Sequence, residues 1–364
     1  MTARCAPTSR PIQMSIFPPL RRLFLAAGLV LPLAGCNTLL LNAPGDIARQ
    51  QGDLIIVATV LMLIIIVPVI ALTLFFAWRY RASNKAATYR PDWDHSLQLE
   101  LVIWAAPLLI IIALGAITWI STHTLDPYRP LDRIAEGRPL PEGTEPLVVE
   151  VVALDWKWLF LYPEQGIATV NELAAPVDRP IQFKLTSSTV MNAFYVPALA
   201  GMIYTMPGMQ TELNAVMNSP GDYEGFSANY SGAGFSSMRF RFHAMDQAGF
   251  DDWVAQVRAG GKLDREAYLA LEKPSERAPV QHFGAVEGGM FEAILNRCVD
   301  PRRMCMHEMM AIDAGNGPGR TGLEGLEERR TGDLRGRRYV QSAMCAATDA
   351  PAASLNTSLS RLAP

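Results

Sequence analysis

The side chains of this 364-residue chain that are best suited to binding a metal ion lie close together near its C-terminal end. Cys298 and Cys305 enclose six residues, and Met304, Met306 and His307 adjoin the second cysteine. Thiolate, thioether and imidazole groups could hold Cu(I) or Zn(II), although this spacing matches no standard closed zinc site. A disulfide between the two cysteines is an alternative in an oxidising compartment. The simplest interpretation is a mobile tail with incidental sulfur.

Glu100 is a second candidate, because it stands alone as an acid at one end of a long apolar segment. A carboxylate inside a bilayer costs a few kcal/mol, which favours a functional role. A glutamate in the first turn of a helix is also stabilised by the helix dipole, by roughly 0.3–1 kcal/mol. The residues alone therefore leave a functional and a purely structural role open.

Cys36 is the third candidate, and its chemistry would be lipidation. Arg21 and Arg22 precede an apolar stretch that ends in Leu33-Ala34-Gly35-Cys36. This pattern is typical of a bacterial export signal, and the cysteine after Ala-Gly resembles the lipobox of bacterial lipoproteins. We predict a lipoprotein signal peptide over residues 1–35, with Met14 as an alternative start, and lipidation at Cys36. The alternative is an ordinary signal peptide with an incidental cysteine.

Two uncharged segments account for most of the apolar excess in the composition. Half of the residues are hydrophobic and only 18% are charged, against about 25% charged in an average soluble domain. Residues 54–78 and 101–120 contain no charge, and each is long enough to cross a bilayer as a helix. We predict a transmembrane hairpin within residues 36–145. The net charge of −3 gives no case for nucleic-acid binding.

The distribution of basic residues predicts the orientation of this hairpin. The linker over residues 79–96 carries four of them, Arg79, Arg81, Lys85 and Arg90, whereas residues 37–53 carry only Arg49. The positive-inside rule therefore places the linker in the cytoplasm and everything after about residue 121 outside. Lipidation at Cys36 requires the same topology.

The exported part begins with the alternating pattern of strands. Apolar and polar residues alternate over 181–185 and 238–244, and 147–152 is a β-branched run. We predict an all-β sandwich over residues 146–245. Helical spacing over 246–258 and 264–272 predicts a helical arm within 246–311. Residues 312–364 contain few large apolar side chains and are predicted to be disordered.

A lipobox, two spans and an exported sandwich together resemble subunit II of the haem-copper terminal oxidases. Residues 156–162, Trp-Lys-Trp-Leu-Phe-Leu-Tyr, are similar to the aromatic stretch on an early strand of that family. Residues 186–197 are similar to its strand that supplies the first copper ligand. The resemblance covers roughly residues 23–300 and implies a cupredoxin-like sandwich after the transmembrane hairpin.

The copper-binding members of this family carry a histidine, followed by Cys-x-Glu-x-Cys-x-x-x-His-x-x-Met. The matching positions of this chain are Asn192, Ser227, Asn229, Ser231, Phe235 and Met238. Serine hydroxyls are hard donors that stay protonated, a phenyl ring has no lone pair, and one thioether is a weak ligand. We therefore predict that this degenerate site binds no copper.

Loss of the copper ligands on a retained scaffold resembles the quinol-oxidising branch, the cytochrome bo-type ubiquinol oxidases, to which residues 223–232 are also similar. This implies subunit II of a proton-pumping complex of the bacterial inner membrane that oxidises ubiquinol and reduces oxygen to water. It further implies that Glu100 takes up protons, that haem and copper reside in subunit I, and that this chain carries no cofactor. The implied partners are the other oxidase subunits, membrane lipid and ubiquinol, but not cytochrome c. The residues leave ubiquinol and menaquinol open.

Two alternative functions agree less well with the residues. A cytochrome c oxidase subunit II, here lacking its copper centre, is disfavoured because the ligands needed to take electrons from cytochrome c are missing. A periplasmic solute- or copper-binding lipoprotein is disfavoured by the two spans, because a lipid anchor alone would suffice.

The sequence also predicts where several aromatic, basic and histidine side chains lie. Trp156, Trp158 and Tyr162 could form an electron-transfer surface, but without a copper centre we favour core and interface packing. We expect Arg239, Arg241 and His243 on the solvated or subunit-facing side of a strand. We expect His95, His123 and His282 to be isolated surface or interface residues rather than ligands.

Overall fold

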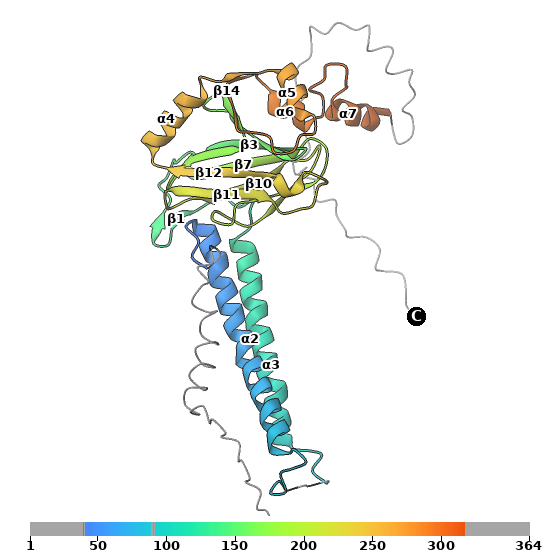
Figure 1. Ribbon diagram of the computed structural model, residues 1–364. Coiled ribbons are helices and arrows are strands. Elements are labelled where there is room, and N and C mark those ends of the chain that lie inside the picture. The colour runs from blue at the N-terminus through green and yellow to red at the C-terminus, as the bar shows by residue number, and fades with distance from the viewer. Residues whose placement is uncertain (1–38, 40, 89, 91, 317–364) are drawn as a thin grey trace, which may run out of the picture.

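The computed structural model describes residues 39, 41–88, 90 and 92–316, and it consists of a long helical hairpin below a β-sandwich (Figure 1). The predicted signal peptide over 1–35, Cys36 and most of the predicted tail lie outside the described residues. The hairpin is formed by α2 (Asp46–Arg79) and α3 (Leu97–Thr124). The loop between these helices lies at the end farthest from the sandwich (Figure 1).

Both predicted spans are confirmed as helices that are long and apolar enough to cross a membrane. Their apolar stretches are exposed to the surroundings, not covered by other parts of the chain. Each helix continues past its apolar segment, because α2 begins at Asp46 and α3 ends at Thr124. These extra turns carry the hairpin up to the underside of the sandwich.

The sandwich consists of two stacked sheets, as predicted. The seven-stranded sheet has the order β10-β7-β3-β4-β5-β14-β13, and the five-stranded sheet has the order β6-β12-β11-β8-β9. The strands of the first sheet are β3 (Leu147–Leu154), β4 (Lys157–Tyr162), β5 (Ile167–Val170), β7 (Pro180–Ser187), β10 (Thr211–Val216), β13 (Gly261–Leu263) and β14 (Gln281–Val286). Those of the second are β6 (Glu172–Pro176), β8 (Asn192–Tyr195), β9 (Ile203–Thr205), β11 (Gly221–Ser227) and β12 (Arg239–Met245).

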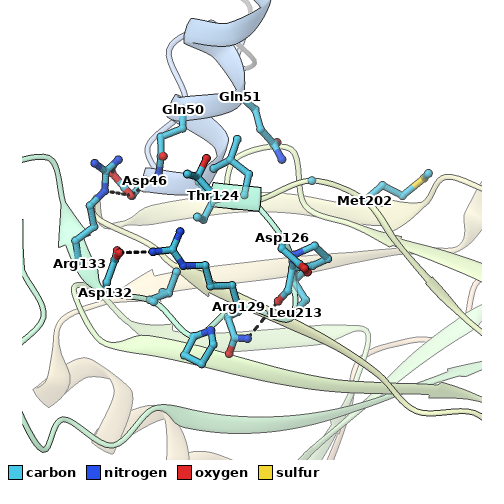
Figure 2. Close-up of a pocket in the computed structure, with 17 residues that line it drawn as sticks. Asp46, Gln50, Gln51, Thr124, Asp126, Arg129, Asp132, Arg133, Met202 and Leu213 are labelled. Atoms are coloured by element: carbon cyan, nitrogen blue, oxygen red, sulfur yellow. Dashed lines mark hydrogen bonds and ion pairs between the residues drawn. The ribbon is translucent and has the colours of Figure 1, made fainter. Parts of the chain in front are cut away.

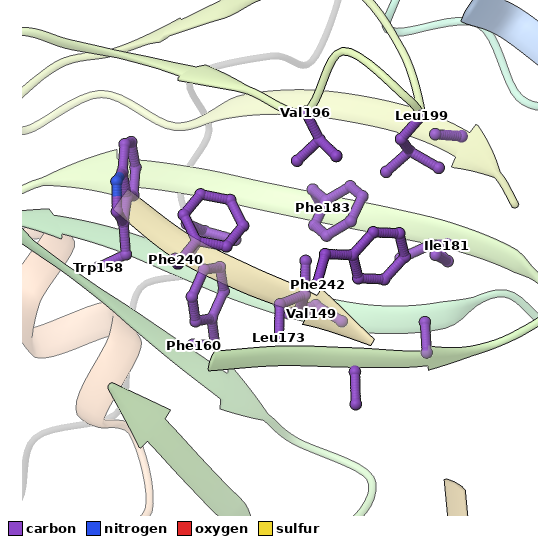
Figure 3. Close-up of a cluster of buried hydrophobic side chains, with 14 of the residues drawn as sticks. Val149, Trp158, Phe160, Leu173, Ile181, Phe183, Val196, Leu199, Phe240 and Phe242 are labelled. Carbon is purple, nitrogen blue, oxygen red and sulfur yellow. The ribbon is translucent and has the colours of Figure 1, made fainter. Parts of the chain in front are cut away.

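An aromatic cluster fills the space between the sheets (Figure 3). The rings of Phe194 and Phe240 are stacked with centroids 5.5 Å apart, and Trp158 meets Phe194 edge-on at 5.4 Å. Aromatic pairs of this kind add about 0.5–1.5 kcal/mol beyond the area they bury. Trp158 and Tyr162 are fully buried, which confirms the predicted core packing of these two aromatic residues.

The C-terminal arm contains α4 (Gln247–Val257), α5 (Arg265–Glu272), α6 (Met290–Leu295) and α7 (Met306–Asn316). It packs on the sandwich in two places: α4 adds side chains to the core between the sheets, and α5 and α6 cover the outer face of the seven-stranded sheet. Asp246 and Asp264 cap α4 and α5 by accepting hydrogen bonds from backbone amides, which explains where these helices begin. A second core forms where Tyr268, Phe291 and Ile294 pack against the outward-facing side chains of β3 and β4.

The arm differs from the predicted one in three respects. It contributes two strands, β13 and β14, to the sandwich, in addition to helices. Cys298 and Cys305 form a disulfide, so the favoured interpretation of incidental sulfur in a mobile tail is wrong for these residues. Helix α7 continues through residue 312 to Asn316, so the described start of the predicted tail is helical.

Candidate functional site

The degenerate copper positions come together at one end of the five-stranded sheet. Asn192 begins β8 and Ser227 ends β11, and these two strands pair antiparallel through Phe226 with Tyr195 and Ser227 with Phe194. The remaining four positions lie on the segment between β11 and β12, which includes a short 3-10 helix at Phe235–Ser237. Strand pairing therefore brings together two segments that are 35 residues apart in the sequence.

A buried hydrogen-bond network links the first of these positions. The Ser227 hydroxyl donates to Asn192 Oδ1 at 3.1 Å, and the exposed fractions of these residues are 3% and 1%. Asn192 Nδ2 donates to the carbonyl of Val190 at 3.2 Å. Both ends of the Asn192 amide are therefore partnered inside the protein, as buried polar groups require.

The other positions lie around this network, and the Asn229 carbonyl is a second acceptor for the Ser227 hydroxyl at 3.3 Å. Asn229 Nδ2 donates to the carbonyl of Met191 at 3.1 Å. The Ser231 carbonyl accepts a hydrogen bond from Trp156 Nε1 at 3.0 Å. Phe235 packs edge-on against Tyr230, with centroids 5.6 Å apart. Met238 is 1% exposed and belongs to the core.

The Trp156 indole determines the shape of the loop that carries these positions. Gly232 has a φ of +116°, and a Cβ at Gly234 would lie 2.5 Å from Trp156 Cγ. Glycine is required at both positions, for the backbone conformation at Gly232 and for the close approach at Gly234. Trp156 is only partly buried and packs against the core, so it agrees less fully with the predicted core role than Trp158 does.

These residues do not fit a copper centre. The side chains that replace the cysteines and the first histidine are hydroxyls and an amide, and the buried Ser227 and Asn192 groups are committed to each other. Such hard, neutral donors bind copper poorly compared with thiolate and imidazole. Within residues 39–316, apart from the three undescribed positions, no group of three or more His, Cys, Asp or Glu side chains is arranged to hold a metal ion.

Glu100 lies at the opposite end of the molecule, in the first turn of α3. Its Oε1 is 2.6 Å from His95 Nδ1, and the two side chains are 45% and 65% exposed. Helix α3 has 28 residues, which corresponds to roughly 42 Å. Glu100 and the degenerate copper positions therefore form two separate sites, and His95 is paired instead of isolated.

A third cluster was missed by the sequence analysis. Glu172 on β6 contacts Nε2 of His243 on β12 at 3.3 Å, and its other carboxylate oxygen bonds Nε2 of His282 on β14. His243 also bonds Asp222 through Nδ1. Arg239 and Arg241 are exposed and His243 is partly exposed, as predicted for that strand. The expectation that His282 is isolated is wrong, because β14 crosses from the arm into the sandwich next to Glu172.

Glu150 on β3 is a carboxyl group whose pKa is perturbed by its surroundings. Burial is the main cause that raises the pKa of Glu150 from 4.5 to about 7. The Lys184 ammonium opposes this shift, and the Glu292 carboxylate on α6 adds to it. Glu150 therefore changes its charge near neutral pH at the contact between sheet and arm.

Comparisons with known proteins agree with this architecture. Residues 147–245 match the family model described as cytochrome c oxidase subunit II, periplasmic domain. Residues 258–302 match the model described as the COX aromatic rich motif. The first match coincides, within one residue, with the sandwich predicted over 146–245, and the second falls inside the arm.

Similar full-length proteins include quinol oxidase subunits from several bacteria. Cytochrome bo(3) ubiquinol oxidase subunit 2 of Pseudomonas putida is 51% identical over 269 residues, which cover 74% of this chain and 83% of the relative. Ubiquinol oxidase subunit 2 of Acetobacter aceti is 51% identical over 264 residues, which cover 72% of this chain and 83% of the relative. Quinol oxidase subunit 2 of Bacillus cereus is 39% identical over 254 residues, which cover 69% of this chain and 84% of the relative. This chain therefore belongs to the family of ubiquinol oxidase subunit 2 proteins.

Proposed function

We propose that this chain is the non-redox subunit II of a proton-pumping oxidase that oxidises ubiquinol and reduces oxygen to water. Haem and copper are held by subunit I, and electrons enter that subunit from quinol in the membrane. The sandwich lies in the periplasm of a bacterial inner-membrane complex, where it serves assembly and structure. Cytochrome c is not a partner, because this chain has no centre to accept its electron.

The observation that carries this proposal is the hydrogen bond from Ser227 to Asn192. Two positions that would supply copper ligands in a cytochrome c oxidase instead satisfy each other inside the protein. An electron-accepting centre would have to break this network and recruit ligands that the loop lacks. The names of the relatives, which include ubiquinol oxidase subunit 2, support the same conclusion.

The topology has independent support in the arm. Disulfides form and persist in oxidising compartments such as the bacterial periplasm. The Cys298–Cys305 disulfide therefore favours a periplasmic sandwich, in agreement with the basic linker between α2 and α3. In the same orientation Cys36 would be lipidated on the outer surface.

Proton uptake is assigned to Glu100 in this proposal. With the linker in the cytoplasm, Glu100 lies at the cytoplasmic end of α3, and its carboxylate is open to solvent and paired with His95. An exposed carboxylate beside an imidazole is chemically suited to take up and pass on protons.

The decisive experiment is a substrate comparison on the purified complex that contains this chain. We expect oxygen consumption with ubiquinol-1 and none above background with reduced cytochrome c. Metal analysis of the same sample should give the copper of subunit I alone, and menadiol distinguishes a menaquinol oxidase. Oxidation of cytochrome c, or two further copper ions per complex, would contradict the proposal.

A further inference from the structure

A cavity lies where the ends of α2 and α3 meet the sandwich (Figure 2). Its volume is about 280 Å³, slightly below the range of about 300–1,000 Å³ typical of pockets for drug-sized ligands. Its wall comes from the first turns of α2, the end of α3 with the segment that follows it, residues 201–202, and β10. A polar group of moderate size would fill it.

The charges around the cavity are of both signs. Asp46 is 2% exposed and is bound by Arg133 through two hydrogen bonds of 2.9 and 3.2 Å. On the more open side, Arg129 pairs with Asp132 at 2.7 Å. Asp126 accepts the backbone amide of Tyr128 at 2.9 Å, and it forms no ion pair with any cation in the described part of the chain.

Asp46 and Arg133 neutralise each other in the buried part of the cavity. Arg129 contacts Asp132 through one terminal nitrogen only, and its side chain is 44% exposed, so its other N–H groups stay available to a ligand. The accessible groups of the cavity are therefore Asp126, Asp132 and Arg129. One guanidinium and two carboxylates would repel a purely anionic ligand. They complement a ligand that carries a cation and an anion a few bonds apart. The Gln51 side chain lies against Gly201 and adds an amide that can donate to an anion.

The level of the cavity relative to the apolar helices indicates where such a ligand would come from. Gln51 is three residues before the apolar run that starts at residue 54, and Thr124 is four residues after the run that ends at 120. At 1.5 Å per residue both lie roughly 5–6 Å beyond the apolar segments. This is the depth of the lipid headgroup layer, since that layer adds about 10–15 Å in total to a hydrocarbon core of about 30 Å.

We propose that this cavity binds the headgroup of an aminophospholipid. The ammonium group is held by Asp126, the phosphate by Arg129 and the Gln51 amide, and the acyl chains follow the exposed apolar surfaces of α2 and α3. Ile47, Leu125 and Met202 supply the apolar part of the lining next to the glycerol backbone. The bound lipid would join the hairpin to the sandwich, and this role does not depend on the quinol chemistry proposed above.

Lipid retention by the intact oxidase complex tests the proposal. The complex is stripped with detergent, incubated separately with dioleoyl phosphatidylethanolamine, phosphatidylglycerol or phosphatidylcholine, and measured by native mass spectrometry. We expect retention of phosphatidylethanolamine that falls about tenfold in Asp126→Asn and in Arg129→Gln, the loss of one charge-assisted hydrogen bond in each case. Glu266→Gln and Arg277→Gln make the same charge changes on exposed arm residues and should retain the lipid.

Photolabelling of the unaltered complex keeps the test independent of the folding of the variants. A phosphatidylethanolamine with a photoreactive headgroup should label residues 46–51 or 124–133 of this chain. Equal retention of phosphatidylglycerol or phosphatidylcholine would overturn the proposal. So would unchanged retention in Asp126→Asn and Arg129→Gln, labelling elsewhere only, or displacement of the lipid by ubiquinone.

Discussion

Ser227 donates a hydrogen bond to Asn192 across the end of the five-stranded sheet, with the two oxygen atoms 3.1 Å apart. By the resemblance to the copper motif, Ser227 matches a cysteine and Asn192 a histidine of the copper-binding members. The hydrogen bond between Ser227 and Asn192 is a contact of two neutral groups that needs no metal ion. The loop is therefore stable as a structural element.

Replacement of Ser227 tests this stabilising role. In Ser227→Ala the Asn192 oxygen loses its donor while it remains buried, so we expect a loss of about 1–3 kcal/mol in the free energy of unfolding. Chemical unfolding of the full chain in detergent measures it. Ser236→Ala, at an exposed position on the same loop, should change stability little; equal effects of the two variants would contradict the importance of the network.

Replacement of Glu100 tests the assignment of proton uptake. We expect Glu100→Ala to slow quinol oxidation on the order of tenfold or more, because a positioned proton-transfer group is lost. Haem content and subunit composition should stay normal. His95→Asn, which removes the partner 2.6 Å away, should produce a smaller decrease. Unchanged turnover in Glu100→Ala would refute the assignment without affecting the choice of quinol as substrate.

The stability of the sheet–arm contact should depend on pH through Glu150. Its pKa is raised by burial to about 7 in the folded protein, against 4.5 when unperturbed. The folded state therefore binds the proton more tightly, and this contribution to stability is complete below about pH 4.5 and is lost as the pH rises through 7.

Glu150→Gln should remove this dependence and raise the melting temperature above pH 7, measured by thermal unfolding between pH 4.5 and 8.5. Glu276→Gln, at an exposed loop position, serves as the control. A variant that kept the slope of the wild-type protein would show that another group is responsible.

The Cys298–Cys305 disulfide should hold the last part of the arm in place. Closing so short a loop stabilises by roughly 2–3 kcal/mol in the chain-entropy model. We expect Cys298→Ser with Cys305→Ser to speed proteolysis around α7, whose Met306 packs against Gly208. Thiol alkylation followed by peptide mass spectrometry should show that neither Cys298 nor Cys305 is alkylated before reduction and that both are alkylated after it. The control Cys345→Ser should neither speed proteolysis around α7 nor change the alkylation of Cys298 and Cys305. Free thiols at Cys298 and Cys305 in the native protein would disprove the pairing.

The contacts of Glu172 with His243 on β12 and His282 on β14 should hold β14 against the sandwich. Glu172→Ala leaves His243 and His282 without this carboxylate, and we expect a cost of about 1–3 kcal/mol. Hydrogen exchange should rise in residues 281–286 more than in β3, because β14 lies nearer the edge of its sheet. Glu224→Ala removes an exposed carboxylate on β11 and should leave exchange in β14 unchanged. The same increase in both variants would argue against a specific attachment.

The amino-acid sequence by itself determined the features that depend on local pattern. The two spans follow from uncharged runs, the sandwich from alternation, and the helices α4 and α5 from helical spacing over residues 246–258 and 264–272. The prediction that Ser227 and Asn192 bind no copper also rests on residue types at positions that resemble the copper motif, without any coordinates. These properties depend on neighbours a few residues away, which a linear pattern contains.

Only the tertiary structure decided the contacts that join distant segments. Glu172 meets His282 across 110 residues, and Asp46 meets Arg133 across 87 residues. Neither pair leaves a periodic signal, because each depends on how the arm returns to the sheet and how the hairpin meets the sandwich. The cavity between α2, α3 and β10 also depends on contacts between distant segments. Its lining comes from four separate segments that only the packing of the hairpin against the sandwich brings together.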